Sequence, residues 1–103
     1  MANLVNLVHV SCDPEVREEL LDKLWVNVHN AREEEHCYQF EVSVAGDNPN
    51  AFIFYEVYKD EAALAWHKEQ QYFLDYFAVV KKFGDKVNRS FKTYWVEDNQ
   101  LTV

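Results

Sequence analysis

Apolar residues recur along this chain with two different periods, and each change of period marks the start of a new element. Residues 3–10 are β-branched and apolar on both alternating faces, a pattern that predicts a central strand covered on both sides. Residues 16–31 repeat at helical spacing after the helix-start signal Asp-Pro-Glu at residues 13–15. Polar residues, among them Asn27, occupy the opposite side of that helix, which is predicted to end near residues 32–35.

Two alternating segments follow and predict an antiparallel hairpin. The first, residues 37–45, gathers its apolar side chains on one face: Tyr38, Phe40, Val42 and Val44. A cluster of turn-forming residues at 46–50 separates this strand from the second strand at 51–59.

A helical region and a final strand complete the pattern. Asp60 suits the N-cap of a helix that is predicted to run to about Gln71. A second helical stretch ends at residues 81–84, where the Lys and Gly residues favour a helix end. Residues 87–97 are rich in aromatic and β-branched side chains and predict the last strand.

This order of elements, β-α-β-β-α-β, is that of the ferredoxin-like split motif. It predicts one α+β domain over residues 1–103, with an antiparallel sheet that carries its helices on one face. Because the strands have apolar residues on both sides, the other face of the sheet also needs cover. The simplest cover is a second copy of the chain, packed sheet against sheet as a homodimer in a dimeric α+β barrel.

Charge and composition exclude several classes of function. The formal net charge is −8, from 18 acidic and 10 basic residues, which argues against a nucleic acid or an anionic membrane as partner. Only two glycines are present, so neither GxGxxG nor a P-loop occurs, and no nucleotide cofactor is expected.

The cysteines and histidines give no sign of a metal site. Cys12 and Cys37 form no CxxC motif, and no pair of histidines has a metal-binding spacing such as HExxH. His9 lies on a predicted strand and is a candidate for burial. Two cysteines in a chain with no secretory signal and no long apolar run predict reduced thiols and a cytoplasmic location.

The candidate chemistry centres on Glu56 and His67. Alternation along the strand puts Glu56 in a row with Phe52, Phe54 and Tyr58, and a lone carboxylate among apolar groups needs a partner. His67 follows on the helix that folds back over the sheet, so the two side chains are predicted to pair. Such a pair is either an acid/base pair that takes a proton from a substrate or a structural lock between helix and strand.

An aromatic stripe extends beyond His67 and consists of Trp66, Tyr72, Phe73, Tyr76 and Phe77. It is interpreted either as the wall of a pocket for a flat substrate or simply as core. Phe40 and Asn6, on the facing strands, are further candidates for such a pocket, since the amide of Asn6 is polar among apolar neighbours.

Residues 52–67, with the sequence FIFYEVYKDEAALAWH, resemble the signature of the antibiotic biosynthesis monooxygenase family, and residues 37–42 resemble its second strand. The resemblance implies a dimer of ferredoxin-like subunits, each with an active-site cavity between sheet and helices. Glu56 and His67 match positions of the family directly. Members include cofactor-free monooxygenases of quinols and polyketide anthrones, an isomerase of a phosphorylated autoinducer-2 breakdown product, and haem-degrading enzymes.

The resemblance does not extend to haem degradation. The tryptophan of that branch matches Trp66, but the position of its iron-ligating histidine is Tyr76 here.

Three functions follow as expectations. The first is a cofactor-independent monooxygenase, in which His67, oriented by Glu56, deprotonates a quinol-like or polycyclic aromatic substrate that then reacts with dioxygen. The second is an isomerase of a small phosphorylated carbonyl compound, with Lys59 and Lys68 holding the phosphate. The third is a dimeric binding or stress-response protein without enzymatic activity.

Overall fold

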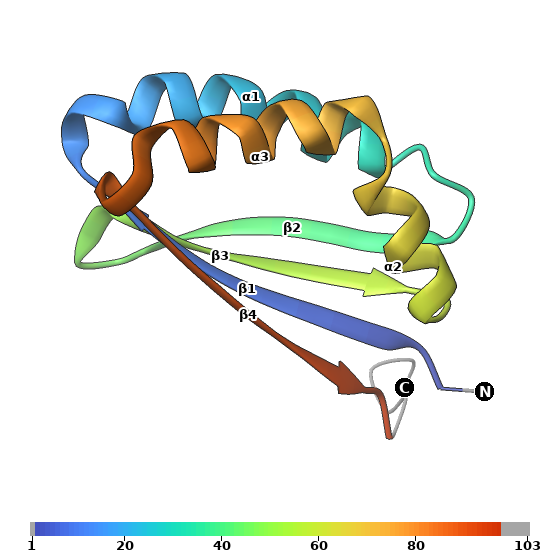
Figure 1. The fold of residues 1–103 in the computed structure, drawn as a ribbon. Coiled ribbons are helices and arrows are strands. Elements are labelled where there is room, and N and C mark those ends of the chain that lie inside the picture. Colours follow the sequence, from blue (N-terminus) through green and yellow to red (C-terminus); the bar gives the residue numbers. More distant parts are fainter. Residues whose placement is uncertain (1, 98–103) are drawn as a thin grey trace.

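A four-stranded antiparallel sheet forms one layer of the molecule, and the helices form the other (Figure 1). The computed structural model describes residues 2–97, so residues 1 and 98–103 of the predicted domain lie outside it. The strand order is β2-β3-β1-β4, so the first strand is central, as predicted. The strands are β1 (Leu4–Cys12), β2 (Cys37–Ala45), β3 (Asn48–Tyr58) and β4 (Val87–Trp95).

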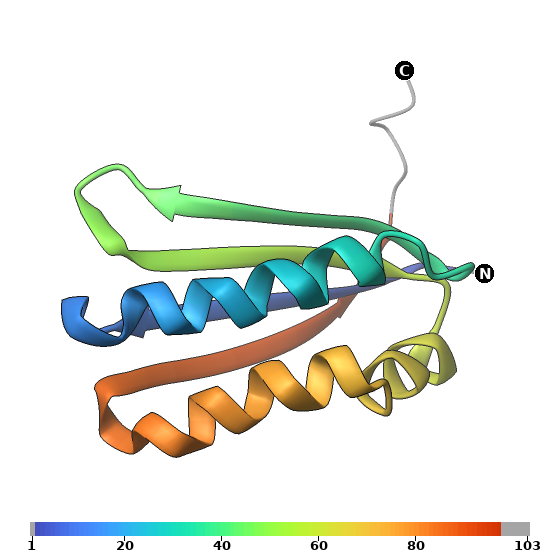
Figure 2. The same ribbon diagram turned by 90° about the horizontal axis from the view of Figure 1, so that it is seen from above.

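Viewed from above, the two long helices lie side by side over the same face of the sheet (Figure 2). The helical elements are η1 (Pro14–Val16), α1 (Arg17–Ala31), α2 (Glu61–Lys68), α3 (Gln71–Phe83) and η2 (Gly84–Lys86). This confirms the predicted α+β, ferredoxin-like fold. Within residues 2–97, no helix is both long and apolar enough to cross a membrane.

The helix that follows β3 is shorter than predicted. The side chain of Asp60 accepts a hydrogen bond from the backbone nitrogen of Ala63 at 2.9 Å and so fixes the start of α2. The helix ends at Lys68 and not near Gln71, because the chain turns extended at Gln70 before α3 begins. His67 therefore lies in the last turn of α2, where its ring faces the sheet.

The prediction that the side chain of Tyr38 lies on the same face of the sheet as that of Phe40 was wrong. The register between β2 and β3 shifts between Cys37 and Gln39, which marks a β-bulge. As a result Cys37 is buried on the helix side, while Tyr38 is exposed and lines a hollow on the opposite face of the sheet.

The prediction for Asn27 was also wrong. It was assigned to the polar side of α1, but it is 2% exposed among the residues that this helix buries. The side-chain oxygen Oδ1 of Asn27 has no hydrogen-bond partner within the described chain.

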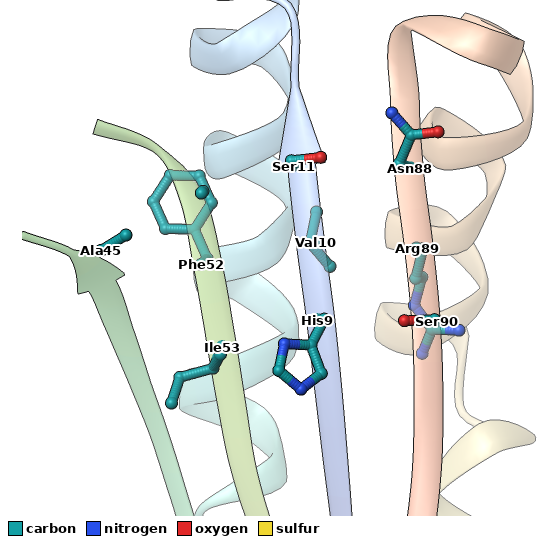
Figure 3. A pocket seen from close by; sticks show the side chains of 10 residues that line it. His9, Val10, Ser11, Ala45, Phe52, Ile53, Asn88, Arg89 and Ser90 are labelled. Atoms are coloured by element: carbon teal, nitrogen blue, oxygen red, sulfur yellow. The ribbon is translucent and has the colours of Figure 1, made fainter. Parts of the chain in front are cut away.

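The face of the sheet turned away from the helices is apolar at its centre and open. Paired positions of three strands project there: Val5, Leu7, Ile53, Tyr55, Val57, Lys92 and Tyr94. At one end it forms a hollow of about 560 Å³ lined by His9, Ser11, Ile53 and Ser90, among others (Figure 3). The expected burial of His9 is not found, since this histidine is exposed on the open face.

Candidate functional site

His67 is buried inside a cage of aromatic side chains. Its exposed fraction is 1%, so the imidazole is almost fully removed from solvent. The rings of four residues lie with their centroids 5.4–6.1 Å from that of His67: Phe40, Tyr58, Tyr72 and Phe73. They come from β2, β3 and α3, so the packing of helices on the sheet assembles the cage.

The hydrogen-bond partner of His67 is Glu34. Oε2 of Glu34 lies 2.6 Å from Nδ1 of His67, and both side chains are at least 95% buried, with exposed fractions of 5% and 2%. The hydroxyl of Tyr72 donates to the same oxygen at 2.6 Å. The expected direct pairing of His67 with Glu56 is therefore wrong: within residues 2–97, no hydrogen bond joins these two side chains.

Glu34 was not singled out by the sequence. It belongs to the acidic run at residues 33–35, which was interpreted only as the end of a helix. Glu33 and Glu35 are exposed, and only Glu34 turns inward from the loop between α1 and β2. No local signal separates these three residues, because the difference comes from the closure of the loop over α2.

Glu56 forms a second polar centre on the same side of the sheet. Its Oε1 accepts hydrogen bonds from the hydroxyl of Tyr58 at 2.8 Å and from the amide of Asn6 at 3.4 Å. Burial raises the pKa of the Glu56 carboxyl, and the Tyr58 hydrogen bond and the charge of His67 oppose this rise. The two centres meet at Tyr58, whose ring belongs to the cage around His67 and whose hydroxyl donates to Glu56.

We expect the Glu56→Gln variant to unfold at a higher temperature than the wild type at pH 7–8. A glutamine keeps the oxygen that accepts from Tyr58 and Asn6 but never carries a buried charge. Because the folded-state pKa is raised, the folded protein binds more protons than the unfolded chain above about pH 4.3. The wild type therefore loses stability as the pH rises from about 4.3 through the raised pKa of folded Glu56, and the variant does not.

Thermal unfolding followed by circular dichroism between pH 4 and pH 8 measures this effect. The gap in melting temperature should widen with pH by several degrees. Glu41→Gln, on the exposed side of β2, is the matched control and should show no such trend. A gap that stays constant or narrows with rising pH contradicts the prediction.

The aromatic stripe is divided between the interior and the surface. Phe73 and Tyr76 are buried, and Phe77 stacks on Phe73 with ring centroids 5.7 Å apart. Trp66, in contrast, is 52% exposed. It lines a pocket of about 510 Å³ whose wall also includes Glu34, the residue whose carboxylate contacts His67.

Unpaired polar atoms lie in the interior between sheet and helices. Oδ1 of Asn6 and the hydroxyl of Tyr76 are buried without a hydrogen-bond partner among the described residues. Burial raises the pKa of Tyr76 to about 12, so its hydroxyl is a neutral donor at ordinary pH. Such atoms usually find a partner, and a bound polar group is one way to supply it.

Metal or thiol chemistry has no support in these residues. In the part of the chain that the structure describes, no three His, Cys, Asp or Glu side chains are grouped to hold a metal ion. Burial raises the pKa of the Cys37 thiol to about 12, which disfavours a nucleophilic thiolate.

The arrangement at His67 is suited to proton transfer. A carboxylate that accepts from Nδ1–H fixes the tautomer in which Nε2 carries a lone pair. Nε2 has no hydrogen-bond partner within residues 2–97, so its lone pair is not engaged by the described chain. Glu34 would then stabilise the imidazolium that forms, as carboxylates do beside catalytic histidines.

Comparisons with known proteins agree with this fold. This chain is 32% identical to the Bacillus subtilis (strain 168) protein named "Putative monooxygenase YcnE". The match extends over 79 residues, which are 77% of this chain and 83% of the relative. A solved structure named "Putative antibiotic biosynthesis monooxygenase from Nitrosomonas europaea" matches with a TM-score of 0.84 and 23% identity, over 95% of this chain and 93% of that one. PA3566 from Pseudomonas aeruginosa matches with a TM-score of 0.81 and 20% identity, over 95% and 97%. Residues 4–79 match the family described as "Antibiotic biosynthesis monooxygenase", and the chain belongs to this family.

Proposed function

We propose that this protein is a cytoplasmic, cofactor-independent monooxygenase that oxidises a quinol-like or polycyclic aromatic molecule with dioxygen. The observation that carries the proposal is the buried imidazole of His67, held by Glu34 inside an aromatic cage. Membership of the monooxygenase family and the name of the Bacillus subtilis relative support the general reaction class.

The proposed reaction begins with proton transfer. A phenolic hydroxyl of the substrate donates its proton to Nε2 of His67, and the charge of Glu34 stabilises the resulting imidazolium. The substrate anion is electron-rich and transfers its electrons directly to dioxygen. A carbon–oxygen bond forms between dioxygen and a ring carbon that bears a hydrogen. The O–O bond and this C–H bond then break, which leaves a carbonyl at that carbon and releases the second oxygen as water, and the C–H and O–H bonds of the substrate supply the four electrons. Burial of the site keeps bulk water away from the anion.

The isomerase hypothesis finds less support in the positions of its lysines. Lys59 lines the pocket next to Glu34, whereas the ammonium of Lys68 lies 4.9 Å from the ring centroid of Phe91. The two side chains therefore lie at different sites. In the described residues they do not form one binding position for a phosphate group.

Oxygen uptake with a panel of quinols and anthrones tests the proposed function. We expect uptake with at least one compound and formation of a product that carries one added oxygen atom. Turnover of a carbonyl phosphate without oxygen would instead favour the isomerase, and no turnover of either kind would favour a binding protein.

We also propose that the chain forms a homodimer through the open face of the sheet. This face is apolar at its centre, and Ile53 and Tyr94 there are 39% and 44% exposed. A second copy related by two-fold symmetry covers the same residues on both subunits.

Sedimentation analysis of the Ile53→Asp variant tests the dimer. The substitution buries an uncompensated charge in each subunit, so we expect dimerisation to weaken by at least about 100-fold. Leu74→Asp changes a similarly exposed residue, at 45%, on α3 and should stay dimeric. A monomeric wild type, or equal effects of both substitutions, would rule out this interface.

A further inference from the structure

Three of the ten basic side chains, one each from α2, α3 and β4, lie over the aromatic rings of Phe77 and Phe91. The ammonium groups of Lys68 and Lys81 lie 4.9 and 5.3 Å from the ring centroids of Phe91 and Phe77. The guanidinium of Arg89 lies between these rings, 5.5 Å from Phe77 and 5.7 Å from Phe91. Each cation thus contacts an aromatic face.

None of these three cations has an ion-pair partner within residues 2–97. Lys82 and Lys86, which are close in the chain, do pair with Glu19 and Glu15. The chain has 18 acidic residues, yet none in the described range 2–97 lies within ion-pair distance of these three cations. The cluster therefore keeps a local positive charge that an anion would neutralise.

The cluster borders a pocket with aromatic walls. Phe77, Lys81, Arg89 and Phe91 line a hollow of about 600 Å³, which is large enough for a small aromatic molecule. Nε of Arg89 is buried, and Arg89 interacts with the hydroxyl of Tyr76, so the donors left for a ligand are the terminal nitrogens of the guanidinium. A guanidinium binds an anionic oxygen with charge-assisted hydrogen bonds.

We propose that Arg89, with Lys81, binds the carboxylate of an aromatic acid whose rings lie against Phe77 and Phe91. This anion site does not depend on turnover, so it is tested separately from the proposed function.

Binding of 2-naphthoate and of 2-naphthamide, its uncharged analogue, to the full-length chain tests the site by calorimetry at low salt. We expect the naphthoate to bind about tenfold more tightly, because one charge-assisted hydrogen bond separates the two ligands. Arg89→Gln should remove this preference and leave the affinity for naphthamide within about twofold. Added salt should weaken naphthoate binding alone.

Two further variants keep the test valid if Arg89→Gln unfolds the protein. Lys81→Gln is an exposed change and should weaken naphthoate binding by a few fold. Lys82→Gln removes the same charge from the neighbouring residue, which pairs with Glu19, and should have no effect. Equal affinity for the two ligands, no binding of either, or equal effects of the Lys81 and Lys82 substitutions would overturn the proposal. A His67→Asn variant that loses turnover but still binds naphthoate separates the two proposals.

Discussion

A His67→Asn variant is expected to lose quinol-dependent oxygen uptake by about 100- to 10,000-fold, the range that a general base contributes. Asparagine is chosen because its amide nitrogen can replace Nδ1–H as the donor to Glu34. It has no basic nitrogen at the position of Nε2, so the proton acceptor is lost while the buried carboxylate keeps a partner. The loss should appear in kcat, with little change in substrate affinity.

The matched control for this variant is His29→Asn. His29 is exposed on α1, where its ring lies 6.0 Å from that of Trp25. Its replacement should leave oxygen uptake within about twofold of the wild type. Uptake by His67→Asn at the wild-type rate would mean that another group removes the proton, and the proposed mechanism would then fail.

The fold could be predicted because its signals are local. The alternation in residues 37–45 and the cap at Asp60 depend on neighbours in the chain, and β2 and the start of α2 appear where they were expected. The errors come from packing. The bulge at Cys37–Gln39 reverses the face of Tyr38, and a shift of one residue leaves no mark in an alternating pattern.

Asn27 was misplaced for a different reason. Its position on α1 follows Leu20 by seven residues and precedes Ala31 by four, so helical spacing places it on the buried side. It was assigned to the exposed side because its side chain is polar. Its burial follows its spacing and not its residue type.

The site residues on the strand and helix that carry a motif could be predicted from the sequence. The site residue in the loop between α1 and β2 could not. Glu56 and His67 stand in the segment that resembles the family signature, and both are buried. Their contact was inferred because the strand and the helix pack together. A side chain on such packed elements has several neighbours, so the packing alone does not identify its hydrogen-bond partner. Glu34, which makes the contact, is separated from His67 by 33 positions and lies between two exposed glutamates.

The Glu34→Gln variant should therefore show the largest effect among residues that the sequence did not indicate. A neutral amide can turn its NH₂ group toward Nδ1, which favours the tautomer with the proton on Nε2. That tautomer cannot accept a proton from the substrate, so kcat should fall by about 10- to 1,000-fold while naphthoate affinity stays within about twofold. Glu35→Gln, on a neighbouring side chain that is 87% exposed, is the control and should behave as the wild type.

A purely structural role for Glu34 predicts a different set of results. Loss of a buried ionic partner would lower the melting temperature but would leave the tautomer of His67 unchanged. Nitrogen-15 NMR of the imidazole distinguishes the two cases, because protonated and unprotonated ring nitrogens have separate chemical shifts. If Glu34→Gln lowers stability and neither shifts the tautomer nor slows oxygen uptake, the Glu34–His67 contact only holds the loop to α2. If the tautomer changes and the rate falls together, the carboxylate is the positioning residue that makes His67 a base.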